Sequence, residues 1–224
     1  MEYICYAPDL LSSDFARHLI HDQEQRGIPC LAVDGDTFAS LAGKENPQGI
    51  IAVARQAARK ILDLTPGTLK WGVALVAPQD PGNIGTILRT IDAVGASGLL
   101  LLDDPANGQF CADPYHPSSV RASMGAIFWY PLVWAKFSEF VQWAKNHRYK
   151  IYGTSAHANQ DYRQVEHFSQ PLILLMGSER EGLTPFQSAV CDVMLNLPMH
   201  GRVSSLNLAI ATGVMLYTMA DKLG

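Results

Sequence analysis

Three loop-like segments carry the polar residues whose types and spacing could do chemistry. The first reads PQDPGNIGTILR from Pro78 to Arg89 and places Asn83 six residues before Arg89. Proline and glycine favour a tight turn from a strand into a helix, and a guanidinium offers a planar fork of donors suited to phosphate. A helix cap followed by a surface arginine explains the same segment equally well.

The second segment reads GSEREGLT from Gly177 to Thr184. It comes close to the nucleotide triphosphate loop G-x-x-x-x-G-K-[ST], but Leu183 stands where that loop needs its lysine. Glu179 and Glu181 would also repel phosphate at close range. The segment therefore argues against nucleotide triphosphate hydrolysis and favours a ligand with hydroxyl groups or a positive centre.

The third segment reads LPMHGRVSSLN from Leu197 to Asn207 and leads into an apolar stretch of helical spacing. Ser204 or Ser205 is expected to cap that helix. Asn207 would then lie just inside the helix, where asparagine is a mediocre helix former, so a functional or bridging role is expected for it.

The elements that must position these segments alternate between strand and helix from Trp71 onward. The apolar runs predict strands at 73–77, 98–102, 150–154, 171–176 and 193–197, and helices at 82–94, 137–146, 185–190 and 206–219. Continuous apolar strands joined by helices predict an α/β fold whose parallel sheet has helices on both faces. Ligands bind beyond the carboxyl ends of such strands, which is where all three segments fall.

The residues before Trp71 predict a smaller module. A helix at 9–27, a strand at 29–33, a helical turn at 36–41 and a strand at 49–54 resemble the latter part of a small α/β domain. Residues 57–70 contain a Thr-Pro-Gly turn signal and are expected to be a linker. The expected divisions are therefore a small domain at 1–56, the linker, and a main domain at 71–224.

Charge argues weakly against a nucleic-acid partner. The chain of 224 residues has 17 Lys and Arg against 21 Asp and Glu, a net charge of −4, and no basic arm. A partner with phosphates would need local basic patches. Two candidates are Arg55, Arg59 and Lys60, and Lys145, Arg148 and Lys150, and a solvated face is the alternative interpretation of each.

Cysteine usage and the N-terminus predict a reduced, cytoplasmic protein. The four cysteines have no C-x-x-C pairing, and the seven histidines have no ligand spacing, so neither a disulfide framework nor a metal site is expected. The start MEYICYAPD has no signal-peptide pattern, and no apolar run approaches the roughly 20 residues that span a membrane.

Taken in order, the three segments resemble the signature motifs of the SpoU (TrmH-like) family of RNA ribose methyltransferases, part of the SPOUT superfamily. The resemblance covers residues 71–220 and includes the intervening Ala122-Ser123-x-Gly125-Ala126. Residues 3–54 resemble the back half of the family's small RNA-binding domain. The opening strand and helix of that domain are missing, so this substrate-binding domain is expected to be truncated.

The resemblance implies methylation of a ribose 2′-hydroxyl by S-adenosylmethionine without a metal, on ribosomal RNA more than on transfer RNA. It also implies a C-terminal trefoil knot and a homodimer whose active site is built across the interface. The implied cofactor-binding residues are Thr154, Gly177, Leu197, Met199 and Leu206. The implied catalytic residues are Asn83, Arg89, Glu179, Ser205 and Asn207.

A sulfonium donor disperses positive charge during methyl transfer, so the protein has mainly to align the hydroxyl with the methyl group. Arg89 is often assigned as the base in this family, but a guanidinium with a pKa above about 12 is a poor base at neutral pH. We expect Arg89 to clamp an RNA phosphate and lower the pKa of the hydroxyl, with Ser205 and Asn207 orienting the nucleophile and the loop.

Three alternatives remain open from the sequence. A related SPOUT enzyme could modify a base instead of a ribose, although Asn83, Arg89 and the Ser205-Leu206-Asn207 run favour ribose chemistry. The chain could instead be an RNA-binding protein that keeps the fold without activity, against which the intact motifs speak. A generic nucleotide-binding α/β protein is the third.

Overall fold

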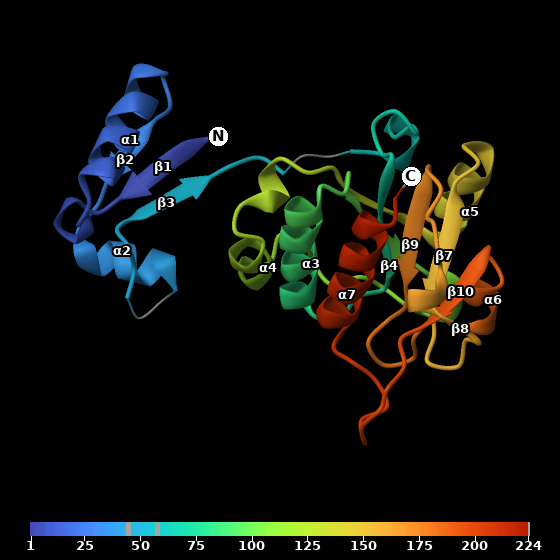
Figure 1. Ribbon diagram of the computed structural model, residues 1–224. Helices are drawn as coiled ribbons and strands as arrows, with labels where there is room; N and C mark the ends of the chain where they lie inside the picture. The colour runs from blue at the N-terminus through green and yellow to red at the C-terminus, as the bar shows by residue number, and fades with distance from the viewer. Residues whose placement is uncertain (44–45, 57–58, 224) are drawn as a thin grey trace. The chain divides into compact units, whose positions relative to one another are not determined.

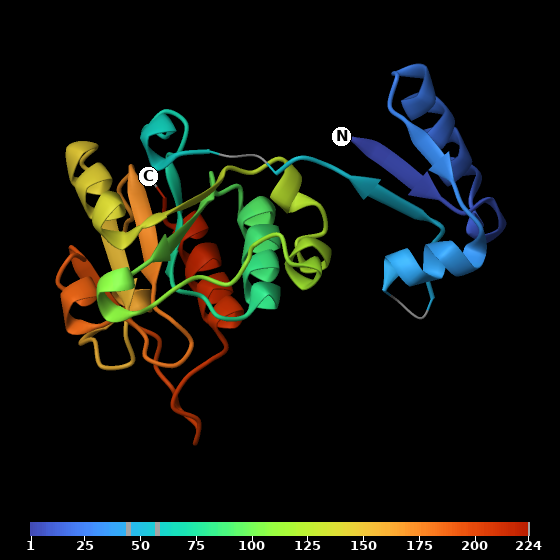
Figure 2. The same cartoon turned by 180° about the vertical axis from the view of Figure 1, so that it is seen from behind.

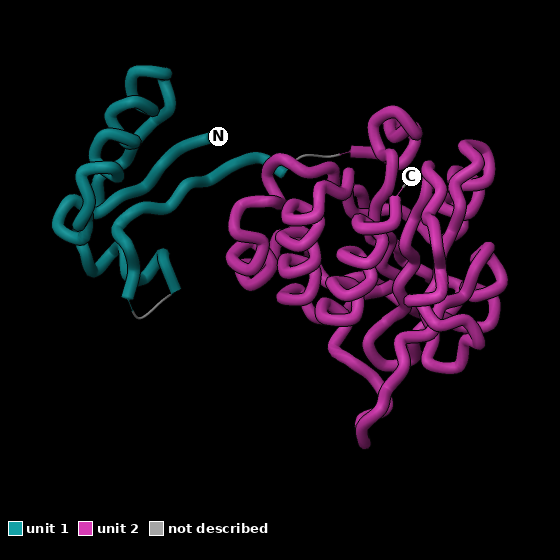
Figure 3. The backbone as a smooth tube through the Cα atoms, viewed as in Figure 1, with its two compact units in different colours: residues 1–57 teal, residues 58–224 magenta. Residues whose placement is uncertain are grey.

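The computed structural model describes residues 1–43, 46–56 and 59–223, and the chain divides into two compact units at 1–57 and 58–224 (Figure 3). Much of the segment expected to be a linker packs within the second unit, because Ile61, Leu64 and Leu69 are buried in one of its cores. No helix among the described residues is long and apolar enough to cross a membrane.

The first unit is a three-stranded sheet of order β2-β1-β3, with β1 parallel to β2 and antiparallel to β3 (Figure 1). The strands are β1 (Tyr3–Tyr6), β2 (Cys30–Ala32) and β3 (Ile50–Val53), with helices α1 (Asp14–Gln25) and α2 (Gly35–Ala42) and the 3-10 turn η1 (Pro8–Leu10). The central strand β1 was not predicted. The helix expected at 9–27 is shorter because the Ser13 side chain caps it by accepting from the Ala16 amide.

The second unit contains a seven-stranded sheet of order β6-β5-β4-β9-β7-β10-β8 in which every pair is parallel. Its strands are β4 (Trp71–Val76), β5 (Leu99–Asp103), β6 (Leu132–Lys136), β7 (Lys150–Thr154), β8 (Gln160–Asp161), β9 (Leu172–Met176) and β10 (Val193–Asn196). The central strands β4 and β9 are buried along their whole length, as continuous apolar runs predict. The parallel α/β sheet expected from the sequence is confirmed.

Helices cover both faces of this sheet (Figures 1 and 2). They are α3 (Pro81–Val94), α4 (Pro117–Ala122), α5 (Phe137–Asn146), α6 (Pro185–Ser188) and α7 (Leu208–Asp221), with 3-10 turns η2 (Ile61–Asp63), η3 (Pro105–Asn107), η4 (Ala126–Phe128) and η5 (Tyr162–Gln164). One core joins the sheet to α3 and α7, and a second core joins its other face to α5. Strands β6 and β8 and helix α4 were not predicted, because each is too short to show a clear period.

Gly85 lets α3 and α4 approach each other closely. A Cβ atom at this position would overlap the carbonyl oxygen of Ser119 on α4, and it would lie 2.9 Å from the Cβ atom of Ala122. Glycine in a helix interior ordinarily costs stability relative to alanine. Close packing therefore explains why the helix carries a glycine at this point.

We expect Gly85→Ala to lower the free energy of unfolding by about 1–3 kcal/mol, because α3 and α4 must separate to admit a methyl group. Denaturant unfolding followed by circular dichroism measures this loss. The matched control is Gly67→Ala, since a Cβ there would have its nearest neighbour 3.6 Å away. Equal stability of the two variants would contradict the close packing.

Candidate active site

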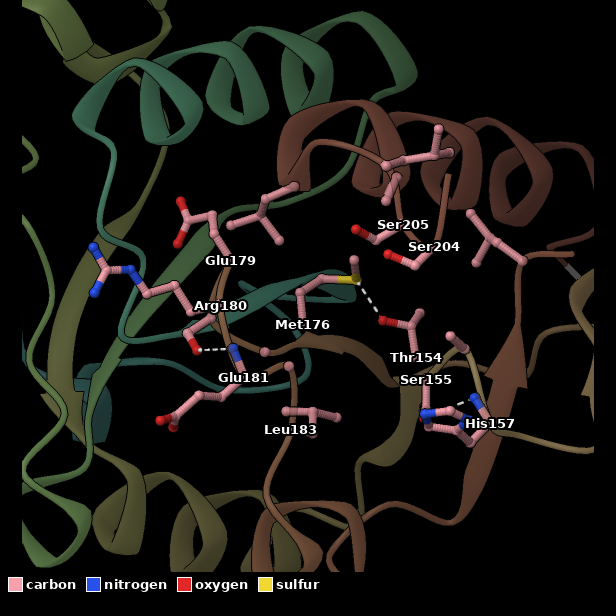
Figure 4. Close-up of a pocket in the computed structure, with 18 of the residues that line it drawn as sticks. Thr154, Ser155, His157, Met176, Glu179, Arg180, Glu181, Leu183, Ser204 and Ser205 are labelled. Carbon is pink, nitrogen blue, oxygen red and sulfur yellow. Dashed lines mark hydrogen bonds between the residues drawn. The ribbon is translucent and has the colours of Figure 1, made fainter. Parts of the chain in front are cut away.

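A cavity of about 400 Å³ lies at the carboxyl ends of β7 and β9. Three segments line it: residues 154–157 after β7, residues 176–183 after β9, and parts of 197–211 between β10 and α7. Figure 4 shows Glu179, Arg180 and Glu181 on one side of the cavity, with Thr154 and Ser204 on the other. The strand-end loops therefore converge where the fold class predicts a ligand.

All five residues expected to hold a cofactor line this cavity, and so do Glu179 and Ser205 of the expected catalytic set. The five are Thr154, Gly177, Leu197, Met199 and Leu206. The sequence did not single out Ser155 or His157, which also line the cavity. The strand-end rule itself was the signal that could have found them, because both follow the predicted strand 150–154 directly.

The turn after β9 forms a closely packed wall of the cavity. A Cβ atom on Gly177 would overlap the backbone of Gly182 and Leu183, and Gly182 has a φ of +66°. The amide of Gly182 donates to the Ser178 carbonyl over 3.0 Å, which closes the turn. Glycine at both positions therefore brings one backbone stretch against another and leaves main-chain groups at the cavity.

The Glu179 carboxylate holds the first and second segments together. It accepts hydrogen bonds from the backbone amides of Gln79 at 3.0 Å and Asp80 at 3.3 Å, and from Asn83 Nδ2 at 3.0 Å. Hydrogen bonds to an ionised acceptor are among the stronger ones in proteins. One acidic side chain thus fixes the loop that begins α3 against the loop that follows β9.

Asn83 continues this connection to the third segment. Its Oδ1 atom accepts from Asn207 Nδ2 at 3.0 Å, and Asn83 is only 6% exposed. The chain of contacts Glu179–Asn83–Asn207 therefore joins three loops that are far apart in sequence. Neither asparagine lines the cavity itself, so both stand beside it, behind Glu179.

The cap of α7 differs from the expectation. Asn207 is the N-cap residue, and its Oδ1 atom accepts from the amides of Ala209 at 2.8 Å and Ile210 at 3.3 Å. Ser204 and Ser205 do not cap the helix, and both line the cavity. Asparagine is among the best N-cap residues, and its side-chain amide group remains free to donate to Asn83. The helix therefore starts two residues later than the sequence predicted.

Arg89 is not brought to the cavity by this chain alone. It lies on α3, exposed, and makes no hydrogen bond or ion pair with any residue that the structure describes. Asn83 occupies the first turn of the same helix, so six residues of helix separate the two side chains. The expected catalytic residues therefore fall into a joined group and one outlying cation.

A relay of side-chain hydrogen bonds supports the loop that carries Glu181, and the sequence gave no signal for it. Gln109 Nε2 donates to Glu181 Oε2 at 2.7 Å, and the fully buried Gln187 donates through Nε2 to Gln109 Oε1 at 3.0 Å and to Asp104 Oδ2 at 2.8 Å. Gln187 also accepts from the Thr184 amide at 3.0 Å, closing a capping box on α6. The relay anchors both ends of the loop 181–184.

The thiols near this region are unreactive in character. Burial is the main factor that raises the pKa of Cys191 to about 12. Burial and the neighbouring Asp103 also raise the pKa of Cys111. Among the described residues, no group of three or more His, Cys, Asp or Glu side chains could hold a metal ion. The polar side chains that line the cavity offer carboxylates, hydroxyls, the imidazole of His157 and the guanidinium of Arg180, beside backbone groups.

The comparisons with known proteins agree on one family. The model of the SpoU rRNA Methylase family matches residues 70–217. A 23S rRNA (guanosine(2553)-2′-O)-methyltransferase of Bacillus subtilis is 30% identical over 193 residues, which cover 86% of this chain and 73% of the relative. A 23S rRNA (uridine(2479)-2′-O)-methyltransferase of Streptomyces viridochromogenes is 35% identical over 213 residues, which cover 92% and 70%.

Solved structures agree with this. An AdoMet-bound rRNA methyltransferase from Sinorhizobium meliloti is 32% identical with a TM-score of 0.85, and the match covers 97% of this chain and 78% of that one. The SpoU methyltransferase AviRb from Streptomyces viridochromogenes, in complex with AdoMet, is 30% identical with a TM-score of 0.84, covering 98% and 82%.

We expect Asn83→Asp to destabilise the protein more at pH 8 than at pH 5. The substitution places a second carboxylate within hydrogen-bond distance of Glu179, and such a pair in the folded state has one pKa raised above its unfolded value. A raised folded pKa contributes stability that is present at low pH and lost as pH rises through the carboxyl range. Denaturant unfolding across this range measures the effect.

The control is Asn83→Ala, which removes the same hydrogen bonds without adding a charge. Its stability loss relative to the unmodified protein should vary little between pH 5 and pH 8. If the two variants followed the same pH profile, position 83 would not face the Glu179 carboxylate.

Proposed function

Because the chain belongs to the SpoU rRNA Methylase family, we propose that it transfers a methyl group from S-adenosylmethionine to a ribose 2′-hydroxyl of ribosomal RNA. The observation that carries this is the Glu179–Asn83–Asn207 connection, which joins all three motif segments to one another beside the cavity. The named relatives act on 23S rRNA at a 2′-oxygen, and structures of similar chains hold AdoMet.

The residues present fit this methyl donor. A cavity of about 400 Å³ is within the range of small-molecule sites, roughly 300–1,000 Å³. The backbone at Gly177, which has no room for a side chain, would present main-chain groups to this donor. The hydroxyl of Ser204 and that of Thr154, which donates to Met176 Sδ at 3.3 Å, would accept hydrogen bonds from it. Glu179 and Glu181 suit a ligand with a positive sulfonium, as the sequence indicated.

The mechanism follows from what each group can do. When bound, S-adenosylmethionine would supply an electrophilic methyl group on a sulfonium. Transfer of this methyl group needs no metal. Ser205, which lines the cavity, orients the ribose hydroxyl, and Asn207 fixes the Ser205 loop to the start of α7. Arg89 clamps an RNA phosphate, and its positive charge favours loss of the 2′-hydroxyl proton to solvent. The ribose oxygen would then bond to the methyl group as the bond from methyl to sulfur breaks, which leaves the neutral demethylated product.

We propose that Arg89 reaches the cavity of a second copy of the chain in a homodimer. Helix α7 leaves Ile210 58% and Tyr217 56% exposed, although most of its residues are apolar. Gly213 lies between them on the same helix. A Cβ atom added at this glycine would have its nearest neighbour in Thr90 of α3, 3.9 Å away. An exposed apolar strip of this kind suits an isologous interface, which would carry α3 and its Arg89 toward the partner.

The remaining expectations complete the proposal. The loop before α7 and the helix itself, through Leu208 and Ala211, share the cavity with the turns after β7 and β9, which suits a C-terminal trefoil knot. Residues 71–224 form the methyltransferase domain and residues 1–56 a substrate-binding domain. We place the protein in the cytoplasm, where its substrate is made. Transfer RNA as substrate, or RNA binding without activity, are the alternatives.

We expect isothermal titration calorimetry to show one S-adenosylmethionine site per chain, and Gly177→Ala to abolish it because a methyl group displaces the Gly182 turn. Gly201→Ala is the control, since a Cβ there has no neighbour within 4 Å. Mapping of 2′-O-methyl groups in total RNA, with and without the gene, should then show the loss of one ribosomal site. A folded protein blind to the donor, or a loss confined to transfer RNA, would contradict the proposal.

We expect Arg89→Ala and Gly177→Ala to be inactive separately and to complement each other when mixed. In a two-fold dimer with Arg89 acting across the interface, each mixed dimer has one complete site, so a fully exchanged equimolar mixture regains about a quarter of the activity. Methyl transfer to the mapped RNA measures this. If mixed dimers form, as shown by mass spectrometry, and no activity returns, Arg89 does not act in the partner's site.

A further inference from the structure

A second cavity, of about 520 Å³, lies beside α5 and wholly within the second unit. It runs between one face of this helix, the edge strand β6 and the segment that precedes β4. Its lining residues are Arg59, Lys60, Ile61, Leu62, Trp134, Ala135, Ser138, Glu139, Gln142, Trp143, Asn146 and His147. None of them lines the cofactor cavity, so this is a separate site.

Exposed apolar side chains mark this cavity as a binding surface. Leu62 is 79% exposed and Trp134 is 46% exposed, and both contribute to the lining. Strand β6 pairs only with β5 among the described strands, so no neighbouring strand covers Trp134 on the outer side. Clustered exposed apolar groups beside a hollow are typical of ligand or partner sites.

Positive charge gathers around the same cavity. Arg59 and Lys60 line it, and three further exposed cations, Lys136, Lys145 and Arg148, are chain neighbours of lining residues. Arg59 and Lys60 of one predicted basic patch therefore line the cavity itself, and Lys145 and Arg148 of the other lie on and just after α5, next in the chain to lining residues. This concentration stands out in a chain whose net charge is −4, and it suits a polyanion.

The nearby acids are engaged in local capping contacts. Glu139 Oε2 accepts from the Lys136 amide at 3.0 Å, and Asp63 Oδ2 accepts from the Lys60 amide at 3.0 Å. Their charges offset part of the positive charge. The five cations still outnumber the two carboxylates.

We propose that this cavity binds a single-stranded segment of the substrate RNA, with a base against Trp134 and its phosphates on Arg59 and Lys60. A stacking surface next to cations is the combination by which proteins hold single strands without reading a sequence. The inference rests on the proposed function for the identity of the polyanion. It adds an RNA contact that lies outside the three motif segments.

The position of the cavity suits an RNA strand that also enters the active site. Strand β6 ends at Lys136 and α5 begins at Phe137, so the end of the cavity lined by Ser138 lies at the carboxyl edge of the sheet. The cofactor cavity opens at that same edge. The ring of Phe137 contacts the ring of Phe186 at 6.1 Å between centroids, which joins α5 to the helix after the cofactor loop.

The first test is the affinity of the full chain for a fluorescein-labelled 12-nucleotide single-stranded RNA of mixed sequence, measured by fluorescence anisotropy. Trp134→Ala should weaken binding about tenfold, within the range seen for loss of one base stacked on an aromatic ring. The matched control is Trp129→Ala, because Trp129 is 57% exposed and does not line the cavity. Equal affinities of the two variants would overturn the proposal.

A second test replaces one cation and, separately, one acid at the cavity with neutral glutamine. Lys60→Gln should weaken binding and reduce the slope of log affinity against log salt by about 0.7, as expected for one lost phosphate contact on a single strand. Glu139→Gln keeps a capping oxygen for the Lys136 amide and should bind at least as tightly as the unmodified chain. An unchanged salt slope in Lys60→Gln would overturn the phosphate contact.

Two further probes separate the sources of this ligand chemistry. Adenosine monophosphate supplies a base and a phosphate without a strand, and it should compete only weakly. Competition as strong as that of unlabelled RNA would make the site a free-nucleotide site and overturn the proposal. Crosslinking of 4-thiouridine-substituted RNA should label peptides that contain Trp134 or Lys60, and labelling confined to other peptides would count against it.

Failure of this inference is distinguishable from failure of the proposed function. The RNA measurements need no S-adenosylmethionine, whereas donor binding is read by calorimetry at a different cavity. Variants at Trp134 and Lys60 that bind the donor normally and have unchanged RNA affinity would overturn only the proposed RNA contact at the cavity beside α5. A chain that binds RNA here but never binds the donor would overturn only the methyltransferase assignment.

Discussion

The carboxylate of Glu179 is the contact on which the geometry of the candidate active site depends. It accepts hydrogen bonds from two backbone amides before α3 and from the side chain of Asn83 in the first turn of α3, and Asn83 passes the connection on to the cap of α7. An acid in this role fits the proposed donor as well as the fold, because it satisfies amide donors and leaves negative charge beside the cavity in which we propose that a sulfonium binds. Structure and chemistry thus use the same residue.

The sheet explains why distant loops can meet at this point. Parallel strands end at one edge, so the segments after β4, β7, β9 and β10 all emerge on the same side. Burial of both faces makes these strands continuous apolar runs, and such runs are readable in a sequence. That is why the main sheet, the helix at 137–146 and the three chemical segments could be predicted, while the sites themselves stay predictions until tested.

The features that could not be predicted depend on tertiary contacts. Strand β1 holds the small sheet together, yet a run of four residues is too short to show a clear period. Asn207 can take the cap with its Oδ1 atom because its Nδ2 atom has an acceptor in Asn83, 124 residues away. Gln109 and Gln187 look like surface glutamines until Asp104 and Glu181 are placed beside them. In each case the deciding partner is remote in the chain.

Net charge is a poor guide to the surface of this protein. A value of −4 for the whole chain argued against a nucleic-acid partner, but it averages over a distribution that the fold makes uneven. Some acids lie at the candidate active-site cavity or cap helices, as Glu179 and Glu139 do. Arg59 and Lys60 lie at the cavity beside α5, and further cations lie on and just after that helix. Because screening limits each charge to roughly 8–10 Å, the local arrangement and not the sum determines what a phosphate backbone would meet.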